Sequence, residues 1–211
     1  MKDRPLLPVA LFPPLAWFVH AQRHGCEVCI HEHYVKQSIR NRIALTTPNG
    51  AVNLSVPVDR RGAASRVVSS ILFTERVRPS LLLKFLQTNY GRAPFFEHYM
   101  EQVELWAHDH LQPRANLVEA ALASTRWACH ELNWQHPPLT DAYQTSNGQD
   151  DWRIPSNWTQ LPNLRYPQVF EDRLGFVEGR SILDVLFHLG PEAATLPSQH
   201  GNCDIGKDSP A

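Results

Sequence analysis

The sequence lacks the features that mark several common protein classes. No stretch of the 211 residues approaches the ~20 apolar residues of a membrane-spanning helix, and Pro8, Pro13 and Pro14 interrupt the apolar N-terminal stretch, unlike a secretory signal. A net charge of −1 gives no indication of nucleic acid or an anionic membrane as a partner. The sequence also has no P-loop, no paired glycine-rich phosphate fingerprint and no Gly-x-Ser-x-Gly motif. Nucleotide binding through such motifs and serine hydrolysis therefore have no support.

Cysteine is scarce for a disulfide-stabilised protein of this size. The four cysteines are Cys26, Cys29, Cys129 and Cys203. They are too few for a disulfide framework, and we expect a reduced, cytoplasmic protein. Cys26 and Cys29, followed by His31 and His33, could form half of a zinc site, but cysteines three residues apart on a strand point to opposite faces. No second ligand cluster is evident, so no metal site is predicted.

A strand–helix–strand unit is predicted at the N-terminus. Residues 8–11 favour a strand, and Pro14 suits the first turn of a helix that Gly25 ends. Residues 27–31 favour a second strand. In such α/β units functional loops follow strands, and the two candidates are residues 12–14 and 31–38.

The segment 34–58 is predicted to be a β-hairpin. Residues 40–45 favour one strand, Pro48-Asn49-Gly50 has the composition of a turn, and residues 52–58 alternate apolar with small or polar side chains. We expect this hairpin to share one mixed sheet with the strand that ends near Ile30.

The remainder of the chain is mainly helical in pattern. A weak β pattern at 67–73 precedes helices predicted from Pro79 to Gly91, from Pro94 and over 115–133, with Tyr90 and Phe95-Phe96 packed as structural residues. Residues 140–163 are expected to form a polar surface loop, and Ser181 should cap a helix that ends near Leu189. The prediction is a mixed α+β domain over residues 1–191, with small sheets followed by a cluster of helices, and a disordered tail over 192–211.

Cations and amides gather at the mouth of the predicted hairpin. They are Lys36, Gln37, Arg40, Asn41 and Arg42. If residues 40–45 form a strand, Arg40 and Arg42 point to the same face and could bind a phosphate or carboxylate. The alternatives are a solvated, positively charged strand end, or structural ion pairs with carboxylates such as Glu171 or Asp184.

Several motifs together resemble the WbqC-like protein family. The central motif comprises residues 34–42, Asn49-Gly50 and residues 54–58. The others are residues 11–18, 90–99, 166–171, 175–176, 181–187 and 190–191. The chain departs from the family at Leu81-Leu82-Leu83, where related sequences often carry Trp and His. The resemblance covers about residues 8–191.

The resemblance implies an enzyme of surface-polysaccharide (O-antigen, lipopolysaccharide) biosynthesis. The expected activity is transfer of an acyl or aminoacyl group, glycine among the candidates, to an amino-sugar precursor. The expected partners are a sugar or sugar nucleotide and an acyl donor, and a homo-oligomer is compatible; no cofactor is indicated. The alternative is a non-catalytic sugar-nucleotide-binding or scaffold protein of a polysaccharide assembly complex.

Transfer to an amine requires a group that removes a proton from the attacking nitrogen. Glu32 is the first candidate for this base, with His31 and Lys36 beside it, because an acidic or polar residue is common here in the family. The alternative is that these are surface residues near a turn. The family match also implies that Glu171 and Asp184 belong to the substrate-binding residues.

Overall fold

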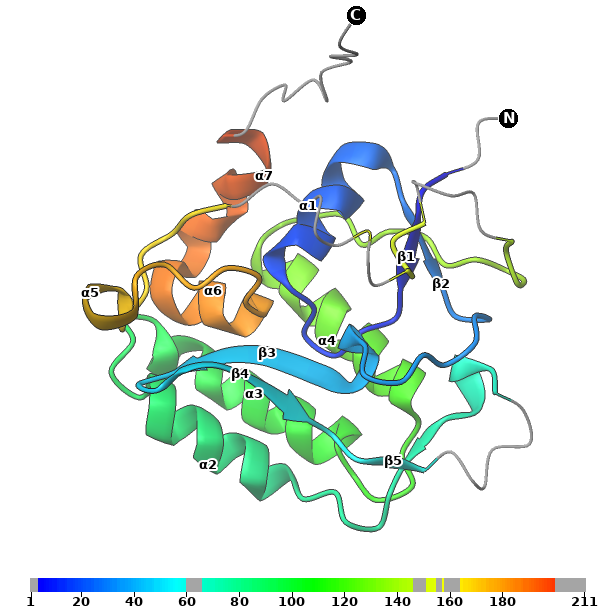
Figure 1. Cartoon of the computed structure of the whole chain (residues 1–211), viewed down its shortest axis with the longest axis horizontal. Helices are drawn as coiled ribbons and strands as arrows, with labels where there is room; N and C mark the ends of the chain where they lie inside the picture. The colour runs from blue at the N-terminus through cyan, green and yellow to red at the C-terminus, as the bar shows by residue number, and fades with distance from the viewer. Residues whose placement is uncertain (1–3, 60–65, 146–150, 155–156, 158–163, 200–211) are drawn as a thin grey trace, which may run out of the picture.

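The computed structural model describes residues 4–59, 66–145, 151–154, 157 and 164–199. The predicted strand–helix–strand unit forms at its N-terminus (Figure 1). β1 (Leu6–Pro8), α1 (Leu15–His24) and β2 (Glu27–Cys29) follow one another. β1 and β2 are parallel, with Leu6 opposite Glu27. β1 lies earlier in the chain than predicted, because the backbone after Pro8 bonds elsewhere: the N–H of Leu11 donates to the carbonyl of Arg40.

Two further segments extend this small sheet in the parallel direction. Leu6 forms a parallel bridge with Asp151, and Val28 forms one with Leu139. The carboxyl ends of these segments therefore lie on one side of the sheet. Asp151 and its neighbours Trp152 and Arg153 are buried, which differs from the surface loop predicted over 140–163. The rest of that segment is described only at residues 140–145, 154 and 157.

The hairpin also forms, but it belongs to a separate sheet. Among the described strands, β3 (Arg42–Thr47) and β4 (Gly50–Ser55) pair only with each other, and β5 (Val58–Asp59) pairs with β6 (Leu72–Phe73). The expectation of one mixed sheet is therefore wrong. The hairpin does not join the parallel strands because other groups occupy the outer edge of β3. There the N–H of Ser181 donates to the carbonyl of Ala44, and the N–H of Thr46 donates to the hydroxyl of Tyr90. Ser181 and Tyr90, both distant from β3 in the sequence, take the place of a neighbouring strand.

Four helices cover the hairpin and the parallel strands (Figure 1). They are α2 (Pro79–Tyr90), α3 (Phe96–His110), α4 (Leu117–Glu131) and α6 (Ile182–Leu189). The hydroxyl of Ser181 caps α6 by accepting from the N–H of Leu183, as predicted. α3 packs against α2, α4 and α6. Tyr90 and Phe96 lie fully in the core and the partly buried Phe95 packs against it, which confirms their predicted packing. The fold class is mixed α+β.

The short elements include one correction to the predicted tail. α5 (Glu171–Leu174) and the 3-10 turns Ile39–Asn41 and Val68–Ser70 are single turns. A further 3-10 helix (Gly190–Thr195) leads into α7 (Leu196–Gln199), which packs on α1. Ala193 and Leu196 are buried, so residues 192–199 are part of the fold, while 200–211 lie outside the described residues. None of the described helices has the length and hydropathy that crossing a bilayer requires.

Candidate functional site

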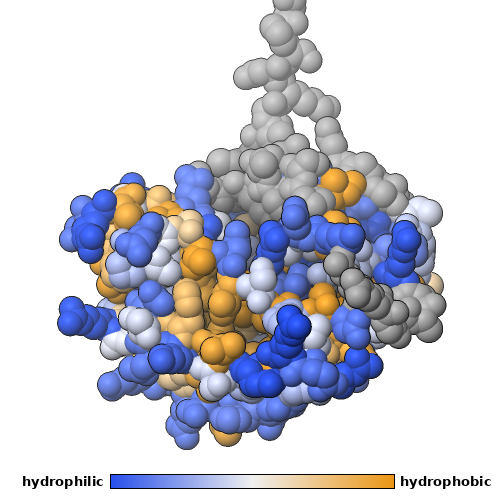
Figure 2. Space-filling view, turned by 60° about the horizontal axis from the view of Figure 1, so that its bottom comes forward, coloured by the Kyte–Doolittle hydropathy of each residue, from blue (hydrophilic) through white to orange (hydrophobic). Residues whose placement is uncertain are grey.

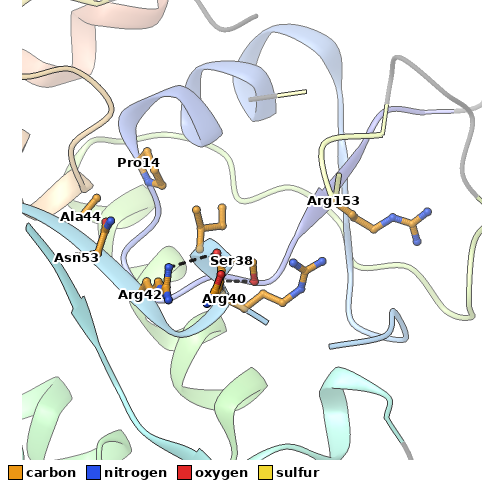
Figure 3. A pocket seen from close by; sticks show the side chains of 9 residues that line it. Pro14, Ser38, Arg40, Arg42, Ala44, Asn53 and Arg153 are labelled. Atoms are coloured by element: carbon orange, nitrogen blue, oxygen red, sulfur yellow. Dashed lines mark hydrogen bonds between the residues drawn. The ribbon is translucent and has the colours of Figure 1, made fainter. Parts of the chain in front are cut away.

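A pocket of about 180 Å³ lies where the parallel segments end and the hairpin begins (Figure 3). Pro14 reaches it from the chain after β1, Arg40 from the chain after β2, and Arg153 from the chain after the bridge at Asp151. Convergence of loops from the carboxyl ends of parallel strands is the usual location of ligand sites in α/β proteins. The pocket is lined by Pro14, Gln37, Ser38, Ile39, Arg40, Arg42, Ala44, Asn53 and Arg153.

Arg40 is held from behind by Glu32. Its Nε lies 2.9 Å from one carboxylate oxygen of Glu32, and a second nitrogen contacts the other oxygen. Both side chains are almost completely excluded from solvent. Burial raises the pKa of the Glu32 carboxyl, and the charges of Arg40 and Arg153 oppose that rise. Arg40 lies in a 3-10 turn and not in β3, so the predicted alternation with Arg42 along one strand is wrong: the hydroxyl of Ser38 caps the turn at the N–H of Arg40.

Arg153 is held in the same manner by Asp151. Its Nε and one terminal nitrogen donate to the two carboxylate oxygens at 2.8 and 2.7 Å. The other terminal nitrogen donates to the carbonyl of Gln144 and to the sulfur of Cys29. The contact with Asp151 raises the pKa of Arg153, so its charge is permanent. Arg40 and Arg153, each held in a buried pair with a carboxylate, thus both line the pocket.

Arg42 and Asn53 are the freer polar side chains of the site. Within the described ranges no carboxylate lies at ion-pair distance from Arg42, whose one recorded hydrogen bond goes to the carbonyl of Gln37 at 3.4 Å. Asn53 lies opposite Ala44 in the hairpin, and its side chain is exposed at the pocket. Figure 3 shows Arg42 and Asn53 on the hairpin side and Arg153 on the far side. The pocket therefore presents a guanidinium and amide groups that can bind an anion.

Two strained backbone positions flank this site. Gln37 lines the pocket with φ of 57°, and Phe12, two residues before Pro14, has φ of 40°. Non-glycine residues rarely adopt positive φ, and such strain clusters at functional sites. The strain at Phe12 is stabilised from both sides, because its N–H donates to Ser124 and its carbonyl accepts from Ser181.

The other predicted site residues are distributed over separate regions. Lys36 is exposed and His31 half-buried, and neither lines the pocket. Asn41 is buried and structural in its contacts: its amide donates to the carbonyl of Val56, and its oxygen accepts from the hydroxyl of Tyr34. In the part of the chain that the structure describes, no three His, Cys, Asp or Glu side chains come close enough to hold a metal ion.

Glu171 and Asp184 lie in two different environments outside the pocket lining. Glu171 pairs with the exposed Arg165. Asp184 is fully buried and accepts hydrogen bonds from the hydroxyls of Tyr90 and Tyr166 at 2.6 and 2.8 Å. Neither carboxylate forms an ion pair with Arg40 or Arg42. Arg40 pairs with Glu32 instead.

Sequence reasoning did not identify Arg153, Asp151 or Asn53. The signal for the first two was the Asp-Trp-Arg order, an acid–base pair around an aromatic residue, within an otherwise polar segment. Asn53 alternates with the apolar Val52 and Leu54 along β4, so the sequence predicts that its side chain lies on the opposite face of the strand from theirs. The sequence does not predict that this side chain lines a pocket.

Comparison with known proteins places the chain in a family. No curated protein and no solved structure matches it. The sequence does match the WbqC-like protein family over residues 10–154, which is well over half of the chain. The match includes every residue that lines the pocket, whereas the motifs at 166–171 and 181–187 lie beyond it. The chain therefore belongs to the WbqC-like protein family.

Proposed function

We propose that the protein binds the anionic group of a small substrate in this pocket and transfers an acyl or aminoacyl group to an amine-bearing sugar precursor. On this proposal it acts in the cytoplasm during surface-polysaccharide synthesis, and glycine is among the groups transferred. The observation that carries the proposal is Arg42, a half-buried guanidinium that faces the pocket with no carboxylate partner among the described residues.

The charges around the pocket favour a singly charged anion. Glu32 neutralises Arg40 and Asp151 neutralises Arg153, so among the described lining residues Arg42 supplies the one uncompensated charge. A carboxylate matches one guanidinium in charge and in two-point geometry. A diphosphate would bring at least two negative charges against that single positive one. The charge balance therefore supports a carboxylate over a nucleotide diphosphate.

The size of the pocket supports the same substrate class. Its volume is about 180 Å³. Drug-sized ligands usually occupy pockets of about 300–1,000 Å³. An amino acid or a short acyl group fits such a space, and the amides of Gln37 and Asn53 can orient it. A sugar acceptor would then approach from the open side.

Glu32 supports this site by orienting Arg40. Both carboxylate oxygens of Glu32 accept hydrogen bonds from Arg40, and the Glu32 side chain is buried. Glu32 could therefore remove a proton from a substrate only after Arg40 releases one of these oxygens. The raised pKa of Glu32 is typical of a general base, whereas its two-point contact with Arg40 is typical of a residue that positions another side chain. We therefore propose that Glu32 acts on the substrate through Arg40.

Binding measurements on Arg42 test the anion site. Titration calorimetry with glycine, acetate, inorganic phosphate and a uridine diphosphate sugar should rank the carboxylates above the diphosphate. Because a charge-assisted contact is worth about 1.5–3 kcal/mol, Arg42→Ala should weaken carboxylate binding by roughly ten- to a hundred-fold, and Arg42→Lys should restore part of the loss. Arg92→Ala, an exposed arginine away from the pocket, is the matched control. Equal binding by wild type and Arg42→Ala contradicts the anion site.

A non-catalytic binding protein is the second candidate function. The observation that favours it is that none of the nine described residues lining the pocket is Asp, Glu, His, Lys or Cys. Mass spectrometry of sugar-nucleotide pools and surface glycan, with and without the gene, separates the two. Loss of an acylated sugar that the Arg42→Ala gene does not restore supports transfer. Unaltered pools together with intact carboxylate binding support the binding function.

A further inference from the structure

The outer edge of β4 is open. Ala44 and Thr46 of β3 direct their backbone groups away from β4, as their bonds to Ser181 and Tyr90 show. In an antiparallel pair, residues directly opposite each other point their backbone groups the same way, inward together or outward together. Ala51 lies opposite Thr46 and Asn53 opposite Ala44, so both direct their N–H and C=O groups to the outer edge. No described residue bonds to them there.

This edge lacks the devices that normally prevent further pairing. Its sequence, Gly-Ala-Val-Asn-Leu-Ser, contains no charge and no proline, and the register with β3 is continuous without a bulge. Charged residues, prolines and bulges are the usual protection of edge strands. An unprotected edge in a hairpin of two strands is a template for a third strand.

An apolar groove of about 310 Å³ runs beside this edge, between β4 and α2. It is lined by Leu54, Ser55, Val56, Pro57, Arg76, Val77, Arg78, Leu81, Leu82 and Leu111. Leu81 is 65% exposed, the highest value among the large apolar side chains of the described residues. Figure 2, which brings the lower side of Figure 1 forward, shows a hollowed apolar area bordered by hydrophilic side chains.

The charged residues of the groove are all cationic. Arg76 and Arg78 are exposed, and no carboxylate of the described chain lies at ion-pair distance from either. Among the described residues, the side chain of Arg78 donates hydrogen bonds only to the carbonyls of Glu75 and Val77. The nearby Asp59 and Glu75 are both paired with Arg114. An occupant that carries carboxylates would complement this rim.

We propose that β4 and this groove form a docking site for an extended peptide segment of a partner protein, one whose aliphatic residues alternate with small polar residues and whose ends carry acidic residues. Its backbone adds to the edge at Ala51 and Asn53, its aliphatic side chains cover Leu54 and Leu81, and its carboxylates meet Arg76 and Arg78. A second copy of the chain fits less well, because β4 and the groove lining contain no carboxylate to offer. This inference does not depend on the transferase proposal.

Fluorescence anisotropy with the labelled peptide acetyl-Glu-Glu-Val-Ser-Leu-Ser-Val-Glu-Glu-amide, which carries Glu on both faces at each end, tests the site on the full chain. We expect saturable binding that Leu81→Asp weakens at least ten-fold and that the double variant Arg76→Glu, Arg78→Glu weakens similarly. Leu105→Asp, at another exposed leucine outside the groove, should bind as the wild type does. Arg42→Ala should also bind normally, which separates this site from the anion pocket.

Two variants of the peptide test the mode of binding. N-methylation at alternate residues removes the backbone donors and should abolish binding, whereas a peptide with Lys in place of Glu should bind at least ten-fold more weakly. The proposal is overturned if the acidic peptide does not saturate at millimolar concentration, or if N-methylation has no effect. Sedimentation that shows a dimer lost in Leu81→Asp overturns it in favour of a second copy.

Discussion

Arg40 and Glu32 form a two-point ion pair inside the protein, with Nε of the arginine 2.9 Å from Oε1 of the glutamate and both side chains shielded from water. The two residues were predicted to have separate roles, one as an anion-binding group and the other as a base. Their pairing makes them one unit, in which the carboxylate fixes the direction of the guanidinium at the pocket wall. Their roles toward a substrate remain proposals.

Breaking this pair should destabilise the fold. Removal of one partner leaves a buried, unpaired charge, which typically costs about 3–5 kcal/mol. Arg40→Ala and Glu32→Gln should therefore lower the free energy of unfolding by roughly that amount in urea titrations. Arg42→Ala, which breaks no ion pair of the described residues, should change it by less than about 1 kcal/mol. A fully stable Arg40→Ala variant would contradict the importance of the pair.

His20 should make stability depend on acid pH. Its ring is buried against Trp152 and near His24, and neither ring nitrogen has a hydrogen-bond partner in the described structure. Burial lowers the pKa of His20 from 6.5 to about 4, with His24 and Arg23 adding to the effect. The unfolded chain takes up this proton below pH 6.5, whereas the folded chain does so only near pH 4.

The stabilisation from neutral His20 is therefore complete above pH 6.5 and is lost as the pH falls toward 4, up to about 3 kcal/mol. Urea titrations between pH 7 and 4.5 should show this decline, and His20→Leu should remove part of it. His24→Leu, at the exposed neighbour, should retain most of the decline. An identical pH dependence in wild type and His20→Leu would contradict the prediction.

Substitution should destabilise the fold much more at Asp184 than at Glu171. Burial acts to raise the pKa of Asp184, but hydrogen bonds from His188, Tyr90 and Tyr166 outweigh it and hold the pKa below its usual value. Asp184→Ala leaves two buried tyrosine hydroxyls unpartnered and should cost about 3 kcal/mol or more. Glu171→Ala removes only a partly exposed pair with Arg165 and should cost less than about 1 kcal/mol. Thermal unfolding of both variants compares the two costs.

Gly190 should not tolerate a side chain. Its φ is 59°, and a Cβ atom would lie 2.6 Å from the ring of Phe95. Gly190→Ala combines backbone strain with overpacking, so we expect a loss of roughly 2–4 kcal/mol in urea titrations. Gly25 has a similar φ of 60° with open space around it, so Gly25→Ala should cost only about 1 kcal/mol. Equal losses in the two variants would show that Phe95 makes room.

Local patterns in the sequence were sufficient for most elements of this fold. Helices α2, α3 and α4, the turn at Pro48-Asn49 and the Ser181 cap were predictable because apolar period, turn residues and caps act within a few positions of the chain. Of the polar residues predicted at the mouth of the hairpin, Gln37, Arg40 and Arg42 line the pocket, and anion binding there is a proposal.

Only the tertiary structure decided which distant groups meet. Whether β3 pairs with another strand or with Ser181 depends on which partner satisfies its backbone inside the packed core, more than a hundred residues away. Glu32 meets Arg40 because the chain after β2 turns back over the end of the sheet, and Arg153 reaches the same pocket from a segment that appeared to be a polar loop. These pairings form because a charge buried away from water is stable only beside an opposite charge. The spacing of residues in the sequence does not indicate which distant charges are buried together.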